Sequence, residues 1–299
     1  MESLYNQTVN PKTLKENLMK IVTDCAADLP AEELKALDIT QAPLYIQFPG
    51  GEVNSADLTA DEFYDRLEAM RPEIPSTAQP STGIFAEIYR KLAETSKQIL
   101  SIHISSGLSG TINSARMGGE GIEDADVTSV DTMTLSGGER FQVLAAALAV
   151  KAGWGVKAIL ERLNKIREHT EVIYTLETLD YLARGGRIGR VQALMGSVLK
   201  IKPVIHVDHT DGKYSTIAKA RTVPQGLGLI VDHLADMYGA IPVWATVLHG
   251  RLASGADSLA NSLHEKLNVK KMEVLRISPV LGVHTGPGIV GAAVVGIKP

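Results

Sequence analysis

The sequence is poor in cysteine and in aromatic residues, and it has no long apolar run. Cys25 is the single cysteine among 299 residues, which excludes an internal disulfide and a thiolate-rich metal site. We expect it to be a small buried residue at a strand end. The longest apolar run, residues 143–150, is too short to cross a bilayer, and residues 1–20 lack a signal-peptide pattern. We therefore expect a cytoplasmic protein with no integral membrane segment.

An excess of positive charge is also missing. The formal net charge is −4, with 21% charged and 44% hydrophobic residues, which is ordinary for a globular protein and argues against a general nucleic-acid binder. A P-loop, a Gly-x-Gly-x-x-Gly after the first strand and clustered metal-binding carboxylates are absent too, so neither a bound metal nor a nucleotide cofactor is expected.

What the chain does have is a regular alternation of short apolar strands and amphipathic helices. Strands are expected at 20–23, 42–48, 99–104 and 126–130, and the second of these is expected to end at the glycines at 50–51. Helices are expected between and after them, including one that begins at a Thr59/Glu62 capping box and one over about 189–200. This alternation and the length predict two α/β domains: the first a doubly wound, mostly parallel sheet, the second a smaller mixed-sheet domain with a hairpin around 209–212. We place an N-terminal extension at 1–18 and the two domains at 19–169 and 170–299.

Three short segments rich in serine, threonine, histidine and glycine lie far apart in the sequence. They are STAQPST at 76–82, SSGLSGT at 105–111 and VHTGPG at 283–288. Each places hydroxyl or imidazole groups beside glycine or proline, and the first two lead into helices whose free N–H groups attract anions. Together they predict one site for a carboxylate or phosphate, although each alone is also typical of an ordinary helix cap.

These segments, in this order, resemble the DegV family of bacterial fatty-acid-binding proteins, the acyl-carrying subunits of fatty acid kinase. The resemblance spans about residues 20–298 and rests on seven segments: TDCAADL (23–29), APL (42–44), TAQPS (77–81), SSGLSGTINSA (105–115), GGRI (185–188), LKIKP (199–203) and HTGPG (284–288). Two positions depart from the family pattern, Cys25-Ala26 in place of Ser-Thr and Ala78 in place of Ser.

The resemblance implies a long-chain fatty acid held with its carboxylate at the domain interface and its tail buried. Thr77 and Ser106 would donate hydroxyl hydrogen bonds to the carboxylate, and His284 would be a third contact. A fatty acid kinase catalytic subunit would phosphorylate that carboxylate to an acyl phosphate for phospholipid synthesis, so that this chain would have no catalytic residues of its own. Apolar segments at 194–201 and 243–248 are the expected tail region.

Basic residues gather near the turn at 185–186. The cluster consists of Arg184, Arg187, Arg190, Lys200 and Lys202. It is either a solvated face that caps helix ends or a docking patch for the kinase, with Arg187 as the residue matched to the family.

Other functions remain open on the sequence alone. Ser106 or Ser109 as nucleophile with His284 as base would give an acyl hydrolase or transferase, although no Gly-x-Ser-x-Gly elbow is present and no third residue is evident to orient His284. A sugar-phosphate enzyme and a DNA-contacting regulator are the less favoured alternatives. His103 and His249 are expected to be structural or solvent-facing.

Overall fold

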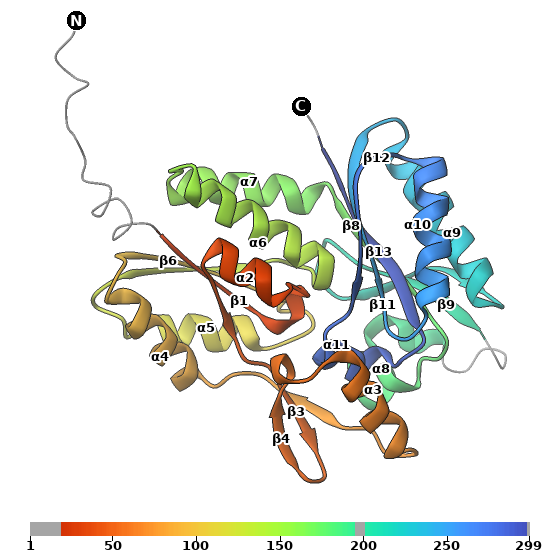
Figure 1. Ribbon diagram of the computed structural model, residues 1–299, viewed down its shortest axis with the longest axis horizontal. Coiled ribbons are helices and arrows are strands. Elements are labelled where there is room, and N and C mark those ends of the chain that lie inside the picture. Colours follow the sequence, from red (N-terminus) through yellow and green to blue (C-terminus); the bar gives the residue numbers. More distant parts are fainter. Residues whose placement is uncertain (1–18, 195–200, 298–299) are drawn as a thin grey trace, which may run out of the picture.

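The computed structural model describes residues 19–194 and 201–297, and there the strands form three sheets (Figure 1). The first sheet is parallel, with the strand order β2-β1-β6-β7. Its strands are β1 (Lys20–Asp24), β2 (Ile39–Ala42), β6 (Gln98–His103) and β7 (Asp126–Asp131).

Helices cover both faces of this parallel sheet. Val22 and Ile99 face α4 (Thr82–Ala93) and α5 (Thr111–Gly119), whereas the alternate residues Ile21 and Leu100 belong to the core on the other face. That second face is covered by α2 (Ala31–Leu37) and α6 (Ser136–Lys151), and α7 (Val156–Glu168) packs on α6. Because successive strand residues point to opposite faces, this two-sided burial produces the doubly wound layer that the sequence predicts.

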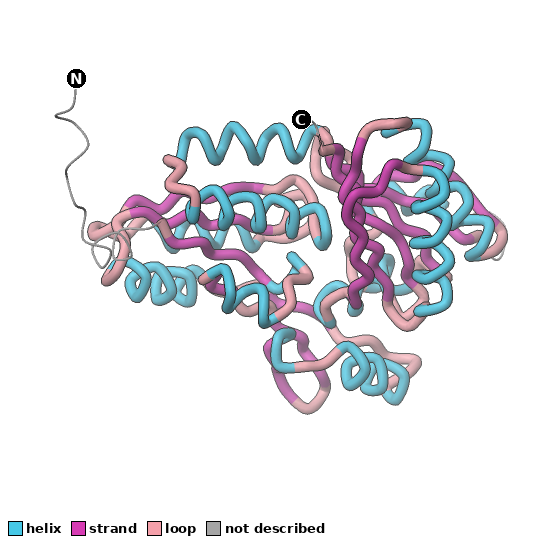
Figure 2. Tube along the Cα trace, turned by 45° about the horizontal axis from the view of Figure 1, so that its top comes forward, coloured by secondary structure: helices cyan, strands magenta, loops and turns pink. Residues whose placement is uncertain are grey.

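The largest sheet is mixed and has six strands in the order β10-β9-β8-β13-β11-β12. They are β8 (Thr170–Leu176), β9 (Lys202–Val207), β10 (Tyr214–Ala220), β11 (Pro242–His249), β12 (Asn268–Arg276) and β13 (Ile289–Gly296). One face packs on α9 (Val223–Tyr238) and α10 (Ala253–Lys266), and the other packs on α6. Figure 2 shows the strands of the two larger sheets running in different directions.

The fold is therefore α/β with a parallel sheet and a separate mixed sheet, as predicted. The mixed sheet begins at Thr170, and α6 contributes to the core on both sides. The domain boundaries 1–18, 19–169 and 170–299 stay a prediction.

A small antiparallel sheet replaces part of one predicted strand. The strand predicted over 42–48 is interrupted at Pro43, because proline has no N–H to donate to a neighbouring strand. β2 ends at Ala42, and β3 (Tyr45–Phe48) belongs to another sheet. There β3 pairs with β4 (Gly51–Asn54) across a two-residue turn and with β5 (Ser76–Ala78). The glycines at 50–51 were predicted to end the strand; instead Gly50 lies in the hairpin turn and Gly51 begins β4.

Among the helices, the predicted capping box of α3 (Ala60–Ala69) is confirmed, since the Glu62 N–H donates to Thr59 Oγ1 and the Thr59 N–H donates to the Glu62 carboxylate. Two short helices, α8 (Asp180–Arg184) and α11 (Pro279–Thr285), were not predicted. The helix predicted at 189–200 is a 3₁₀ turn over Gly189–Leu194, and 195–200 lie outside the described residues. Within the described ranges, no helix is long and apolar enough to cross a membrane.

Candidate functional site

A cavity of about 310 Å³ lies where the ends of β1 and β6, the small sheet and α11 meet. Its volume falls within the range of small-molecule sites. Most of its wall is apolar, formed by Ala26, Leu44, Ala78, Ile104, Leu108, Leu135, Val280 and Leu281. The polar lining residues are Thr77, Gln79, Ser109, Arg187, Tyr214 and His284. The cavity therefore combines a long apolar wall with a few hydrogen-bonding groups.

Two of the three predicted carboxylate contacts meet in this cavity. Thr77 Oγ1 lies 2.8 Å from His284 Nε2, although the residues are 207 positions apart in sequence. Thr77 is on β5, and His284 is in the last turn of α11, which ends at Gly286 with a φ of 72°. A positive φ is easily reached by glycine, so the HTGPG segment stops the helix directly after the histidine.

The environment of His284 favours the neutral imidazole. Burial, reinforced by the nearby Arg187 guanidinium, lowers the pKa of His284 from 6.5 to about 4. Its Nδ1 is buried and has no hydrogen-bond partner among the described residues. At neutral pH the ring therefore carries a single N–H. Its Nε2 lies against Thr77, and its Nδ1 faces Gly185, where an added Cβ would meet it.

Arg187 was predicted to dock a partner protein. The structure places it in the cavity wall. Its Nε donates to the Leu108 carbonyl at 3.3 Å and its Nη1 donates to the Gly185 carbonyl at 2.9 Å. The side chain is half-buried, so its charge reaches both the cavity and the surface. The predicted role of Arg187 in partner docking is not tested by this geometry.

The other described members of the basic cluster are bound within the chain. Arg184 donates to the Pro72 carbonyl, and Lys202 donates to the Glu177 carbonyl at 2.6 Å. Arg190 pairs with Asp208 and Asp211 at 2.9 and 3.0 Å. Lys200 lies outside the described residues. These partners favour a structural role for Arg184, Arg190 and Lys202.

Ser106 is the one predicted contact that the structure does not bring to the cavity. Its side chain is exposed, and its backbone N–H donates to the Asp131 carboxylate at 3.2 Å. The neighbouring Ser105 is buried and donates to the Gly212 carbonyl at 2.8 Å. Ser109, three residues further along the same loop, is the hydroxyl residue that lines the cavity. The assignment of Ser106 to the carboxylate stays a prediction.

The apolar wall also differs from the predicted tail region. Of the two predicted segments, 195–200 lie outside the described residues, and 243–248 lie in β11, between β13 and β12 of the mixed sheet, and are not among the cavity-lining residues. The wall comes from residues next to the family motifs, such as Leu108 and Leu281. Their apolar character was visible in the sequence, but their shared location was not.

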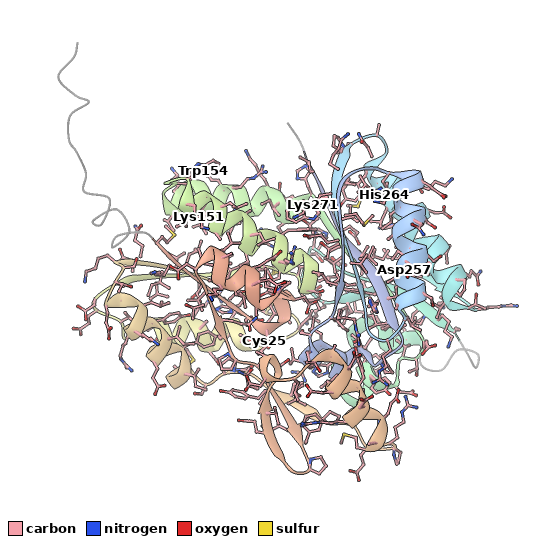
Figure 3. The ribbon with its side chains drawn as sticks, viewed as in Figure 1. Cys25, Lys151, Trp154, Asp257, His264 and Lys271 are labelled. Carbon is pink, nitrogen blue, oxygen red and sulfur yellow. The ribbon has the colours of Figure 1, made fainter. Side chains whose placement is uncertain are left out.

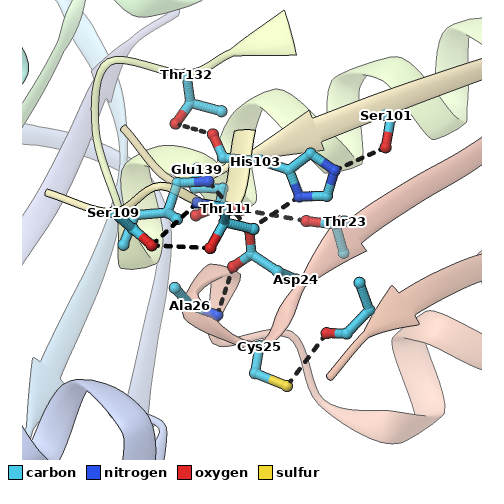
Figure 4. Close-up of polar contacts among 12 residues, drawn as sticks. Thr23, Asp24, Cys25, Ala26, Ser101, His103, Ser109, Thr111, Thr132 and Glu139 are labelled. Carbon is cyan, nitrogen blue, oxygen red and sulfur yellow. Dashed lines mark hydrogen bonds and ion pairs between the residues drawn. The ribbon is translucent and has the colours of Figure 1, made fainter. Parts of the chain in front are cut away.

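A buried polar network lies next to the cavity wall, and Figure 4 shows its contacts. Ser101 Oγ lies 2.7 Å from His103 Nε2, and His103 Nδ1 lies 2.9 Å from Asp24 Oδ2. Asp24 also accepts hydrogen bonds from the N–H groups of Ala26 and Ile104, which line the cavity. The network thereby fixes the position of two wall residues.

This network has the order of a serine–histidine–aspartate triad but not its accessibility. The side chains of Ser101, His103 and Asp24 are fully buried, and the serine hydroxyl also lies 2.8 Å from the Tyr89 hydroxyl. A nucleophile must reach its substrate, so these residues are structural, as expected for His103. In the cavity itself, His284 contacts Thr77 instead of a serine.

Cys25 and Glu139 lie near the same network, and burial raises the pKa of both side chains. The Cys25 thiol contacts the Ala42 carbonyl at 3.6 Å and is buried at the end of β1, as predicted. Burial raises its pKa to about 12, which disfavours the thiolate. Burial, reinforced by the neighbouring Asp24, also raises the pKa of Glu139 well above its ordinary value. Thr23 donates to Glu139 at 3.2 Å.

Comparison with known proteins agrees with the resemblance that the motifs indicate and with the fold. The model of the DegV family matches residues 18–296. The chain belongs to the DegV family. A DegV domain-containing protein of Staphylococcus aureus is 33% identical over 276 residues, which cover 92% of this chain and 97% of that protein.

Solved DegV structures have the same fold. A DegV family protein from Thermus thermophilus, described as fatty acid binding, superposes with a TM-score of 0.87 at 30% identity, covering 93% of this chain and 99% of that chain. DegV of Bacillus subtilis, described as a fatty acid binding protein, gives a TM-score of 0.86 at 27% identity, covering 94% and 100%. A stearic acid-binding protein from Eubacterium ventriosum gives 0.84 at 26% identity, covering 93% and 98%.

Proposed function

We propose that this chain binds one long-chain fatty acid in the cavity, with the carboxylate beside Thr77, Ser109 and His284 and the tail along the apolar wall. The observation that carries the proposal is the Thr77–His284 pair in a cavity whose wall is mostly apolar. The DegV structures described as fatty acid binding support it.

The energetics assign different tasks to the two ends of the ligand. A saturated sixteen-carbon acid has about 14 methylenes, and at about 0.8 kcal/mol each their burial contributes on the order of 11 kcal/mol before ordering costs. The carboxylate needs hydrogen bonds, because an unpaired carboxylate taken out of water is strongly disfavoured. Ser109 can donate its hydroxyl hydrogen, and Thr77 can donate its own while it accepts the Nε2–H of His284. The positive charge of Arg187 favours the anion.

The finer proposal is that this chain presents its fatty acid to a fatty acid kinase and performs no catalysis itself. The kinase would convert the carboxylate to an acyl phosphate for phospholipid synthesis, and the exposed part of Arg187 would contact the kinase. Support comes from the resemblance and from the position of Arg187 between cavity and surface. Arg187→Ala should lower acyl-phosphate formation in the presence of a kinase; loss of the lipid at the same time would assign Arg187 to the carboxylate instead.

The direct experiment is mass spectrometry of the purified protein, native and after organic extraction, to count bound fatty acid per chain. We expect about one per chain. The matched variants Ser106→Ala and Ser109→Ala then separate the two serines: loss of lipid in Ser109→Ala alone supports the cavity geometry, and loss in Ser106→Ala alone supports the motif-based assignment.

The hydrolase alternative has its own outcome in the same preparation. A protein that neither retains nor takes up fatty acid would contradict the carrier proposal. Covalent labelling of Ser109 by a fluorophosphonate would favour a serine nucleophile, because Ser109 shares the cavity with His284.

A further inference from the structure

A second apolar site lies on the surface between α6, α7 and the strands β11 and β13 of the mixed sheet. This α6–α7 groove has a volume of about 490 Å³ and shares no lining residue with the cavity. Its lining residues are Phe141, Leu144, Ala145, Leu148, Ala149, Ala152, Trp154, Arg162, Lys165, Ile166, His169, Trp244, Val295, Gly296 and Ile297. Figure 3 shows Trp154 and Lys151 at the α6–α7 end of the molecule, with Lys271 on the neighbouring sheet.

The groove exposes large apolar side chains to solvent. Leu148 is 56% exposed and Trp154 is 47% exposed, and both are among its lining residues. Ala145, Ala149 and Ala152 follow one another along α6 and leave a slot that larger side chains would fill. An exposed apolar groove of this kind marks a site for a ligand or partner.

The charges on the opposite wall identify the chemistry of the occupant. Arg162 and Lys165 lie on one side of α7, three residues apart, and His169 directly follows the helix. No acidic residue is among the described lining residues. Within the described ranges, the side chains of Arg162 and Lys165 have no hydrogen-bond or ion-pair partner. Two unpaired cations beside an apolar slot suit a single alkyl chain with an anionic head group. A second copy of this chain, related by a twofold axis, would instead bring its own cations against these.

We propose that the α6–α7 groove binds a free long-chain fatty acid as a second site, with its carboxylate on Arg162 and Lys165 and its alkyl chain against Leu148 and Trp154. This proposal does not require the cavity to bind lipid. Because the groove is open to water on one side, its affinity should be lower than that of a buried site and should fall as salt rises.

The two tryptophans of the chain provide a selective probe, since Trp154 and Trp244 both line the groove and the cavity lining contains none. A dibrominated stearic acid, titrated into delipidated protein, should quench tryptophan fluorescence in a saturable manner. Arg162→Glu with Lys165→Glu should raise the apparent Kd for quenching about tenfold or more, because two attractive charges become repulsive. Leu148→Glu, at a largely exposed position that tolerates the change in folding, should also weaken it.

Matched controls separate this proposal from the cavity. Lys91→Glu with Lys157→Glu makes the same charge change at exposed positions outside the groove and should leave quenching unchanged. Thr77→Val alters the cavity and should also leave quenching unchanged. Equal quenching in both charge-reversal variants, or quenching lost in Thr77→Val, would overturn the second site, as would quenching seen only with brominated phospholipid vesicles.

Discussion

The contact between Thr77 and His284 makes the carboxylate site testable by one nearly isosteric substitution. Thr77→Val keeps the β-branched shape that suits strand β5 and removes only the hydroxyl that lies 2.8 Å from His284 Nε2. Since His284 Nδ1 already lacks a partner, both ring nitrogens would then be without a hydrogen bond from the described chain.

The size of the effect follows from this loss. A polar group left without its partner in a largely buried place costs about 1–3 kcal/mol. In the empty protein this should appear as a lower free energy of unfolding. The bound carboxylate also loses a hydroxyl donor, so fatty-acid affinity should fall by roughly 5- to 150-fold, at 1.4 kcal/mol per factor of ten.

Two assays check both consequences. Denaturant unfolding of delipidated protein gives the stability change, and competition with a fluorescent fatty acid gives the affinity change. Thr77→Ser keeps the hydroxyl and should stay close to the original protein in affinity. A Thr77→Val protein that binds fatty acid as tightly as Thr77→Ser would refute the assignment of Thr77 to the carboxylate.

Three further predictions concern the surroundings of the site. The pKa of His284 in the folded protein, about 4, lies below its ordinary value of 6.5, so its contribution to stability is present above pH 6.5 and is lost as the pH falls towards 4. A bound carboxylate should raise this pKa. Histidine NMR of the empty and the loaded protein can measure the change. Burial raises the pKa of Asp28 from 3.8 to about 6. Its contribution to the free energy of unfolding therefore falls by roughly 3 kcal/mol as the pH rises from below 3.8 to above 6. Asp28→Asn should remove this part of the pH dependence in unfolding experiments. Gly107→Ala should lower the thermal midpoint, because its Cβ would lie 2.4 Å from the Asp211 carbonyl oxygen of the β9–β10 turn; an unchanged midpoint would mean that this turn is not packed on the loop as described.

The sequence predicted features that depend on local chemistry. The Thr59/Glu62 capping box, the alternation of strands and helices and the hairpin between β9 and β10 were all readable, because hydrogen bonds and turn residues close in sequence specify them. The prediction of one strand over 42–48 was wrong, because it did not account for the interruption at Pro43. The prediction that the strand ends at the glycines at 50–51 missed the hairpin, since such residues can either end a strand or form a turn to the next one.

The sequence by itself determined the alternation of strands and helices and the family motifs, and it predicted that Thr77 and His284, 207 positions apart, belong to one site. Only the tertiary structure decided which neighbouring side chains reach the cavity. Ser105, Ser106 and Ser109 share one loop, yet one is buried against Gly212, one faces solvent and one lines the cavity. Backbone direction within a loop depends on what packs against it, and here that is a hairpin about a hundred residues later in the chain. The same reason places Arg187 in the cavity wall: the carbonyls that hold its guanidinium, those of Leu108 and Gly185, come together only when the chain has folded.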